Sequence, residues 1–191
     1  MVVALPGKDP GASAELCRVL GAKSGDTFER PKLPWAWESS VSEEWVNNTI
    51  EGMREIAQAL NLGHCEFISR DGKLSEGLAG AYIPVVGDRA NVQLAVLSSA
   101  QGNRNMARSL LQMDPDDADL TSEDVADAVC EISNMLAGRV KAGMAQKEPG
   151  LRLGLPVFID GRLEEGNARK VNIVQMSVAN DRVSVMVMTN A

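Results

Sequence analysis

The stretch SEDVADAVCEISNMLAGRVKAGM, residues 122–144, has the apolar spacing of one long amphipathic helix. At about 3.6 residues per turn its large apolar side chains fall on a single stripe, which predicts a face packed on a hydrophobic core. The stripe consists of Val125, Ala128, Val129, Ile132, Leu136 and Val140. Thr121 and Ser122 supply an N-cap signal, and we expect the helix to continue to about Ala145.

The opposite face of this helix carries polar and small residues, namely Asp127, Glu131, Asn134 and Gly138. Glu131 and Asn134 stand at positions i and i+3, so their side chains can reach one external object together. A glycine inside a helix costs about 1 kcal/mol relative to alanine. No turn is needed at Gly138, and the close approach of a partner's backbone next to Asn134 is one explanation for the glycine.

The segments around this helix predict further helices and strands, with the strands grouped in two blocks. The expected elements are a helix over residues 42–61, strands over 64–69, 78–86 and 91–98, a helix over 103–113, and strands over 152–160, 168–179 and 182–189. This order favours an α+β fold with a largely antiparallel sheet over alternating βαβ units. Pro156 must then lie at an edge or a bulge. The last two strands form a hairpin rich in Val and Met, which we expect to offer an exposed sheet edge.

The first forty residues differ in composition from the rest of the chain. Residues 1–40 are punctuated by proline and glycine, which predicts an N-terminal extension followed by one domain over residues 41–191. Ser42 is a suitable N-cap for the first helix of that domain, and Asn61 and Gly63 are suitable residues to close it.

Composition excludes several classes of function. A formal net charge of −7 and an aromatic content of 4% argue against a nucleic-acid partner, which needs clustered cations and stacking platforms. No apolar run is long enough to span a bilayer, and the first residues lack the cationic start of a signal peptide, so we expect a cytoplasmic protein. Cys17, Cys65 and Cys130 lie far apart and are expected to be reduced thiols. His64 adjoins Cys65, but no third group is in evidence for a metal or nucleophile site.

A second Glu-x-x-Asn spacing occurs at Glu44 and Asn47 in the first helix. Carboxylates near the start of a helix are favoured by the helix dipole, so such a spacing also arises without any function. No small residue accompanies this pair. We therefore interpret it as an ordinary polar turn.

The string EISNMLAG, from Glu131 to Gly138, resembles the ExxNxxxG active helix of the CheC/CheX chemotaxis phosphatases. Asp127 matches the acidic or serine position before that motif, and Pro156 matches a proline that follows it. The resemblance covers roughly residues 42–191, and the single motif is typical of the CheX-like branch. It implies a two-layer fold in which the active helix packs on a mostly antiparallel sheet. One departure is that Arg139 follows Gly138, where the family motif often continues with asparagine.

The resemblance also implies a function. In that family the helix docks on a phosphorylated CheY-like receiver domain and hydrolyses its aspartyl phosphate. By this likeness Asn134 orients the attacking water, Glu131 pairs with a lysine of the receiver, and Asp127 and Gly138 border the docking surface. The receiver is expected to supply Mg²⁺, so no metal or other cofactor is expected on this chain. Pairing of two copies through their sheets is a further expectation.

Two other interpretations remain open at this stage. The flagellar switch proteins share the fold implied here, so the chain can be a binding module that recognises a signalling partner without turnover. The departure at Arg139 favours this reading, whereas the presence of both Glu131 and Asn134 argues against it. A structural subunit of an oligomer is the third interpretation.

Overall fold

The computed structural model describes residues 35–70, 74–88, 91–114, 119–160, 169–178 and 181–190. The predicted extension over residues 1–40 lies almost wholly outside these ranges, and so does the expected turn at Asp71 and Gly72. The proposed domain boundary therefore stays a prediction. From Glu38 onward the chain forms one compact unit.

The order of elements confirms the α+β class. The elements are α2 (Trp35–Ala59), β1 (Cys65–Arg70), β2 (Ala79–Val86), β3 (Asn91–Ser98), α3 (Ala100–Leu111), α4 (Ser122–Met144), β4 (Arg152–Leu153), β5 (Val157–Asp160), β6 (Arg169–Val178) and β7 (Asp181–Asn190). The expected strand over residues 152–160 is divided into β4 and β5, with Pro156 between them. A proline cannot donate to a strand ladder, which explains the interruption.

The strands form one antiparallel sheet in the order β1-β6-β7-β3-β2-β4, with β5 also paired to β2. This order corrects one expectation. β6 lies between β1 and β7, and β7 lies between β6 and β3, so the C-terminal hairpin is interior. Its Val and Met residues are explained by burial on both faces of the sheet rather than by an exposed edge.

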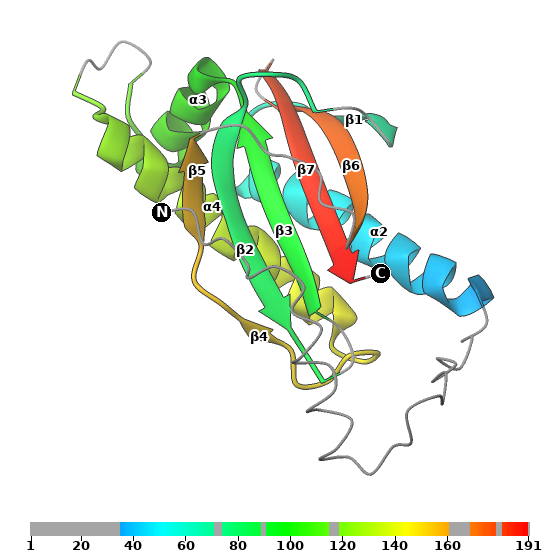
Figure 1. Cartoon of the computed structure of the whole chain (residues 1–191). Helices are drawn as coiled ribbons and strands as arrows, with labels where there is room; N and C mark the ends of the chain where they lie inside the picture. The colour runs from blue at the N-terminus through cyan, green and yellow to red at the C-terminus, as the bar shows by residue number, and fades with distance from the viewer. Residues whose placement is uncertain are drawn as a thin grey trace, which may run out of the picture. The chain divides into compact units, whose positions relative to one another are not determined.

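The helices α2 and α4 cover one face of this sheet (Figure 1). The main core lies between the two layers and joins Trp45 of α2, Ile132 of α4 and Val185 of β7, all buried. A smaller apolar cluster lies on the other face of the sheet and includes Leu97 and Met186. The alternation of valine and methionine along β7 therefore serves two clusters, one on each face.

The first helix begins earlier than predicted. α2 starts at Trp35, so Ser42 lies inside the helix and is not its N-cap. The other end agrees with the prediction: α2 ends at Ala59, and both Asn61 and Gly63 have positive φ angles, of 51° and 74°. Residues that tolerate the left-handed region commonly end helices in this way.

Candidate functional site

The start of α4 is fixed by a capping box. Thr121 is the N-cap, and its Oγ1 accepts a hydrogen bond from the backbone N–H of Asp124 at 3.1 Å. In return, the Asp124 carboxylate accepts from the backbone N–H of Thr121 at 3.0 Å. The hydrogen bonds from the side chain and backbone of Thr121 hold the pKa of Asp124 below its ordinary value. The sequence signal at Thr121 is thus confirmed, and it sets where the helix begins.

The rotation of α4 about its axis is set by what it buries. The predicted apolar stripe is buried in full, from Val125 to Val140. Ser133, which is also buried, donates from Oγ to the carbonyl oxygen of Ala81 in β2 at 3.4 Å. Because Ser133 faces the sheet, the side chains on the far side of the helix must face away from it.

Glu131 and Asn134 stand side by side on this outward face. Glu131 is exposed and Asn134 is half-buried. The Asn134 Nδ2 donates to the Glu131 Oε2 at 3.4 Å. That separation is long for an N–H···O hydrogen bond, so the amide and the carboxylate are neighbours without being locked together. Both groups remain available to a third object.

Asp127 and Gly138 extend the same face in the two directions along the helix. Asp127 is exposed one turn before Glu131, and Gly138 lies one turn after Asn134. A Cβ added at Gly138 would meet nothing within 4 Å. Packing inside the chain therefore does not require glycine at this position. The structure brings together all four residues that the sequence singled out, which we call the α4 face.

Cys130 adjoins this face but is poorly suited to act as a nucleophile. Burial raises the pKa of its thiol, and the negative charge of Asp127 raises it further. The thiol is therefore protonated at neutral pH, and the thiolate is the reactive form of cysteine. The chemistry of the α4 face rests on its carboxylate and its amide.

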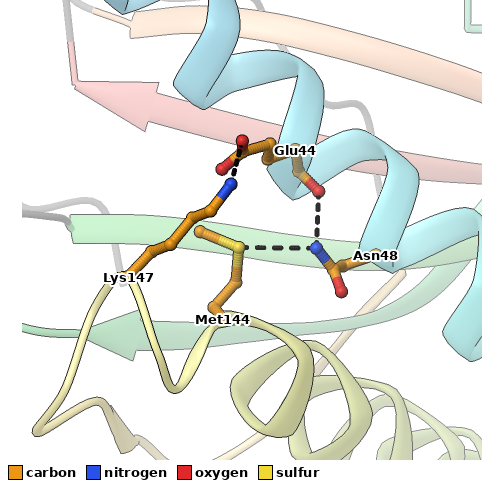
Figure 2. Close-up of polar contacts among 4 residues, drawn as sticks. All are labelled: Glu44, Asn48, Met144 and Lys147. Carbon is orange, nitrogen blue, oxygen red and sulfur yellow. Dashed lines mark hydrogen bonds and ion pairs between the residues drawn. The ribbon is translucent and has the colours of Figure 1, made fainter.

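The second Glu-x-x-Asn pair is engaged within the fold. Glu44 forms an ion pair with Lys147, which follows the end of α4 (Figure 2). Asn47 accepts a hydrogen bond from Arg70 of β1 at 2.9 Å. This arrangement agrees with the interpretation of the pair as structural, although it lies within the helix rather than in its first turn.

Close contacts hold α2 against α4. Asn48 of α2 donates to the sulfur of Met144 at 3.5 Å and to the carbonyl oxygen of Glu44 at 2.9 Å (Figure 2). A Cβ added at Gly143 would overlap the Asn48 Oδ1, so a larger residue there would displace the Asn48 side chain from its hydrogen bonds. The two glycines of α4 thus differ: Gly143 is explained by helix packing and Gly138 is not.

Arg139 belongs to the contact between these helices. Its guanidinium pairs with Glu55 of α2 at 3.1 Å. A Cβ added at Gly52 of α2 would lie 3.1 Å from the Cβ of Arg139, so the two helices touch at this point. The departure from the family motif is therefore accommodated beside α2, away from Glu131 and Asn134.

One charged residue beside the α4 face was not singled out from the sequence. Lys141 is exposed and follows Asn134 by seven residues, a spacing that returns to nearly the same side of a helix. Extending the helical wheel by one more turn beyond Gly138 would have found it. In the part of the chain that the structure describes, the side chain of Lys141 has no hydrogen bond or ion pair.

A hollow of about 530 Å³ lies away from the α4 face. It is lined by Asn47, Asn48, Ile50, Glu51, Arg54, Phe67 and Arg70. No described residue of α4 contributes to it. Four of its polar side chains bind one another: Arg54 pairs with Glu51 at 3.3 Å, and Arg70 donates to Asn47. This hollow is therefore separate from the α4 face, and most of its polar side chains already have partners within the chain.

The remaining candidates from the sequence show no assembled site. His64 contacts Glu66 at 2.7 Å on the surface. Burial raises the pKa of Cys65, and the nearby charge of Arg54 offsets only part of that effect. Among the described residues, no three His, Cys, Asp or Glu side chains are grouped so that they could hold a metal ion. No helix within the same ranges is long and apolar enough to cross a membrane.

One comparison with known proteins identifies a family for this chain. The family described as chemotaxis phosphatase CheX matches residues 79–176, just over half of the chain. The match includes β2, β3, α3, α4 and most of β6, and so contains the whole α4 face. Among curated proteins, no sequence matches the chain.

Solved structures share the fold at low sequence identity. A chemotaxis protein CheX from Desulfovibrio desulfuricans has a TM-score of 0.65 at 15% identity, over 77% of this chain and 99% of that one. CheX from Vibrio vulnificus has a TM-score of 0.64 at 18% identity, over 77% and 99%. A chain of the CheX–CheY–BeF3–Mg²⁺ complex from Borrelia burgdorferi has a TM-score of 0.61 at 17% identity, over 77% and 98%.

Proposed function

The chain belongs to the chemotaxis phosphatase CheX family, and from that premise we propose that it dephosphorylates a CheY-like receiver domain by hydrolysing its aspartyl phosphate. The observation that carries the proposal is the pairing of Glu131 with Asn134 on an outward helix face. A relative of the same fold occurs in a complex with CheY, beryllofluoride and Mg²⁺, which supports a receiver as the partner.

In the proposed reaction Asn134 positions water and does not act as a base. Its amide can donate and accept at once, so it can hold a water in line with the phosphorus without repelling the phosphoryl group. The water oxygen forms a bond to phosphorus, and the bond from phosphorus to the aspartyl oxygen breaks. The electron pair of that bond leaves with the carboxylate, and both protons of the water remain on the dihydrogen phosphate. Phosphoryl transfer depends mainly on positioning and charge stabilisation, so a neutral amide suffices.

Glu131 supplies the proposed anchor. Its exposed carboxylate would pair with a lysine of the receiver and so fix the register in which the helix docks. Asp127 and Gly138 border the same surface, and we propose that both contact the receiver. The Mg²⁺ that phosphoryl transfer needs is bound by the receiver and arrives with the substrate, so the proposal asks for no cofactor on this chain.

Three parts of the proposal concern the setting of the protein rather than its chemistry. We propose that it acts in the cytoplasm, where receiver domains are phosphorylated. We propose that it forms a homodimer. The signalling pathway is either chemotaxis or another two-component system, and the identity of the receiver that responds decides between them.

The test is to time the loss of phosphate from several phosphorylated receivers of the same cell. The protein is expected to accelerate at least one of them, and Asn134→Asp is expected to abolish this effect by placing a carboxylate against the phosphoryl group. Asn47→Asp is the matched control, because it makes the same change in the second Glu-x-x-Asn pair and should keep full activity. Glu131→Ala is expected to raise KM about tenfold with a smaller change in kcat.

Three outcomes would overturn the proposal. If a receiver binds but loses phosphate at its own rate with the wild-type protein, the chain is the non-catalytic binding module. If no receiver binds at all, a structural role is favoured. Equal losses of activity in the Asn134 and Asn47 variants would separate activity from the α4 face.

A further inference from the structure

The charges on the exposed side of α4 are divided between the two ends of the helix. The first half of the exposed surface of α4 carries carboxylates and the last turns carry an ammonium group. The exposed carboxylates are Glu123, Asp124, Asp127 and Glu131. Lys141 lies in the last turns, and Asn134 lies between the two groups. A phosphoryl dianion that approaches Asn134 therefore meets repulsion from one side and attraction from the other.

Lys141 is placed to reach the space next to Asn134. The two residues are about 20° apart around the helix and about 10 Å apart along it. Helical side chains lean towards the N-terminus and cover the turn before their own Cα. The turn before Lys141 contains Gly138, which has no side chain and leaves open space on this face. Lys141 thus lies over a gap that is bordered on its other side by Asn134. The Asn134 amide contacts Glu131 at 3.4 Å, and this long contact leaves it free to turn towards the gap when a partner docks.

We propose that the phosphoryl group of the receiver sits over Gly138, between the amide of Asn134 and the ammonium of Lys141, and that Lys141 binds a phosphoryl oxygen. This inference rests on the proposed phosphatase function and adds a charge-stabilising residue to it. The arrangement accounts for a glycine that packing does not require. It also places the substrate charge on the side of Asn134 that is away from Glu131.

A lysine in the last turn of a helix has another possible use, because it stabilises the negative end of the helix dipole. That role acts on folding and has no effect specific to a phosphoryl group. A cation at any position in the last turn would fill that role equally well. The two roles therefore differ in what a substitution changes: thermal stability for the dipole, and the handling of the phosphorylated receiver for the proposed contact.

The experiment compares Lys141→Ala, Lys141→Arg and Lys141→Glu with the wild type on the receiver that the wild type dephosphorylates. Steady-state phosphate release is measured at low and high salt. Binding is measured with the receiver in the presence and absence of beryllofluoride. Arg70→Ala is the control, because it removes one positive charge from β1, at the opposite end of the sheet order from the strands under α4.

For Lys141→Ala we expect a fall in kcat/KM of about tenfold, as for the loss of one charge-assisted contact. We expect a larger fall in kcat/KM for Lys141→Glu, and a kcat/KM for Lys141→Arg that is close to the wild-type value. High salt should narrow these differences in kcat/KM, because it screens the charges. Lys141→Ala should weaken binding of the beryllofluoride-activated receiver more than that of the unactivated receiver. Arg70→Ala should match the wild type in both assays.

Each other result decides against the inference. If the wild type is active and Lys141→Ala equals Arg70→Ala in rate and binding, the Lys141 contact is wrong while the proposed function stands. If Lys141→Ala lowers thermal stability but leaves kcat/KM unchanged, its role is that of a dipole partner. If the wild type dephosphorylates no receiver, the proposed function and this inference both fail.

Discussion

Gly138 and Gly143 lie in the same helix and have opposite surroundings. Gly138 has nothing within 4 Å of the position a Cβ would take, whereas a Cβ at Gly143 would meet the side-chain amide of Asn48. Alanine is favoured over glycine in a helix interior by about 1 kcal/mol. We therefore expect Gly138→Ala to raise the free energy of unfolding by about 0.5–1 kcal/mol, measured by urea denaturation. The same variant should lower the rate of receiver dephosphorylation, because its methyl group occupies the docking surface.

Gly143→Ala is the control for this prediction. Its added methyl group would overlap the Asn48 side chain and displace it from its hydrogen bonds to Glu44 and Met144, so we expect a loss of stability of about 1–3 kcal/mol. A Gly138→Ala variant with unchanged or faster dephosphorylation would show that no partner approaches this position.

The local spacing of residues was enough to predict the α4 face but not its surroundings. Positions 127, 131, 134 and 138 must share a side of any regular helix, so the structure had little freedom to separate them. The pairing of Glu44 with Lys147 joins residues that are far apart in the sequence, and no local pattern contains it. For the same reason the turn of Arg139 towards Glu55 could be found only from the packed helices.

At the scale of the element, the capping box makes the start of α4 sensitive to acid. The pKa of Asp124 is lowered in the folded chain, so its stabilising contribution is present above its unfolded pKa of about 3.9 and is lost as pH falls through the folded value. We expect Asp124→Asn to be less stable than the wild type near neutral pH. The difference should shrink as the pH falls below about 4.

Urea midpoints measured at a series of pH values check this expectation. Glu123→Gln serves as a neighbouring control, because it removes a carboxylate from the same turn without touching the capping box. Parallel pH profiles for the wild type and Asp124→Asn would rule out a stabilising role for the Asp124 carboxylate.

The two long helices show why one helix start was predictable and the other was not. Thr121 follows a segment broken by Pro115, so its cap signal stands alone and is correct. Ser42, Glu43 and Glu44 give an equally good start signal inside α2, but the helix continues upstream to Trp35. Because a serine can lie in a helix interior as well as at its start, this pattern could not exclude the longer helix.

For the whole molecule, the order of strands in the sheet decides which strands lie at its edges and could pair with a second copy. Among the described strands the C-terminal hairpin is interior, and the outermost strands are β1 on one side and the short strands β4 and β5 on the other. β1 presents Phe67 and Ile68 to solvent, and β5 presents Val157. Strand order depends on pairing between distant parts of the chain. The alternating pattern within β6 and β7 therefore could not reveal that β1 and β3 flank this hairpin on its two sides.

The predicted homodimer can be tested without knowledge of its interface. We expect sedimentation equilibrium to give twice the chain mass of 20.4 kDa at micromolar concentration. Asn134→Ala should have the same mass, because the α4 face is needed for the receiver and not for pairing in this account. A monomer at every concentration would contradict the predicted dimer and leave the phosphatase proposal unaffected.

The account depends on the amide of Asn134 acting on a phosphoryl group that belongs to another protein. The most direct measurement is the single-turnover rate of phosphate release from a responsive receiver at saturating protein, for the wild type and for Asn134→Ala. The account predicts that the variant still binds the beryllofluoride-activated receiver but releases phosphate at least about 100-fold more slowly than the wild type. Release by Asn134→Ala at the wild-type rate would contradict it.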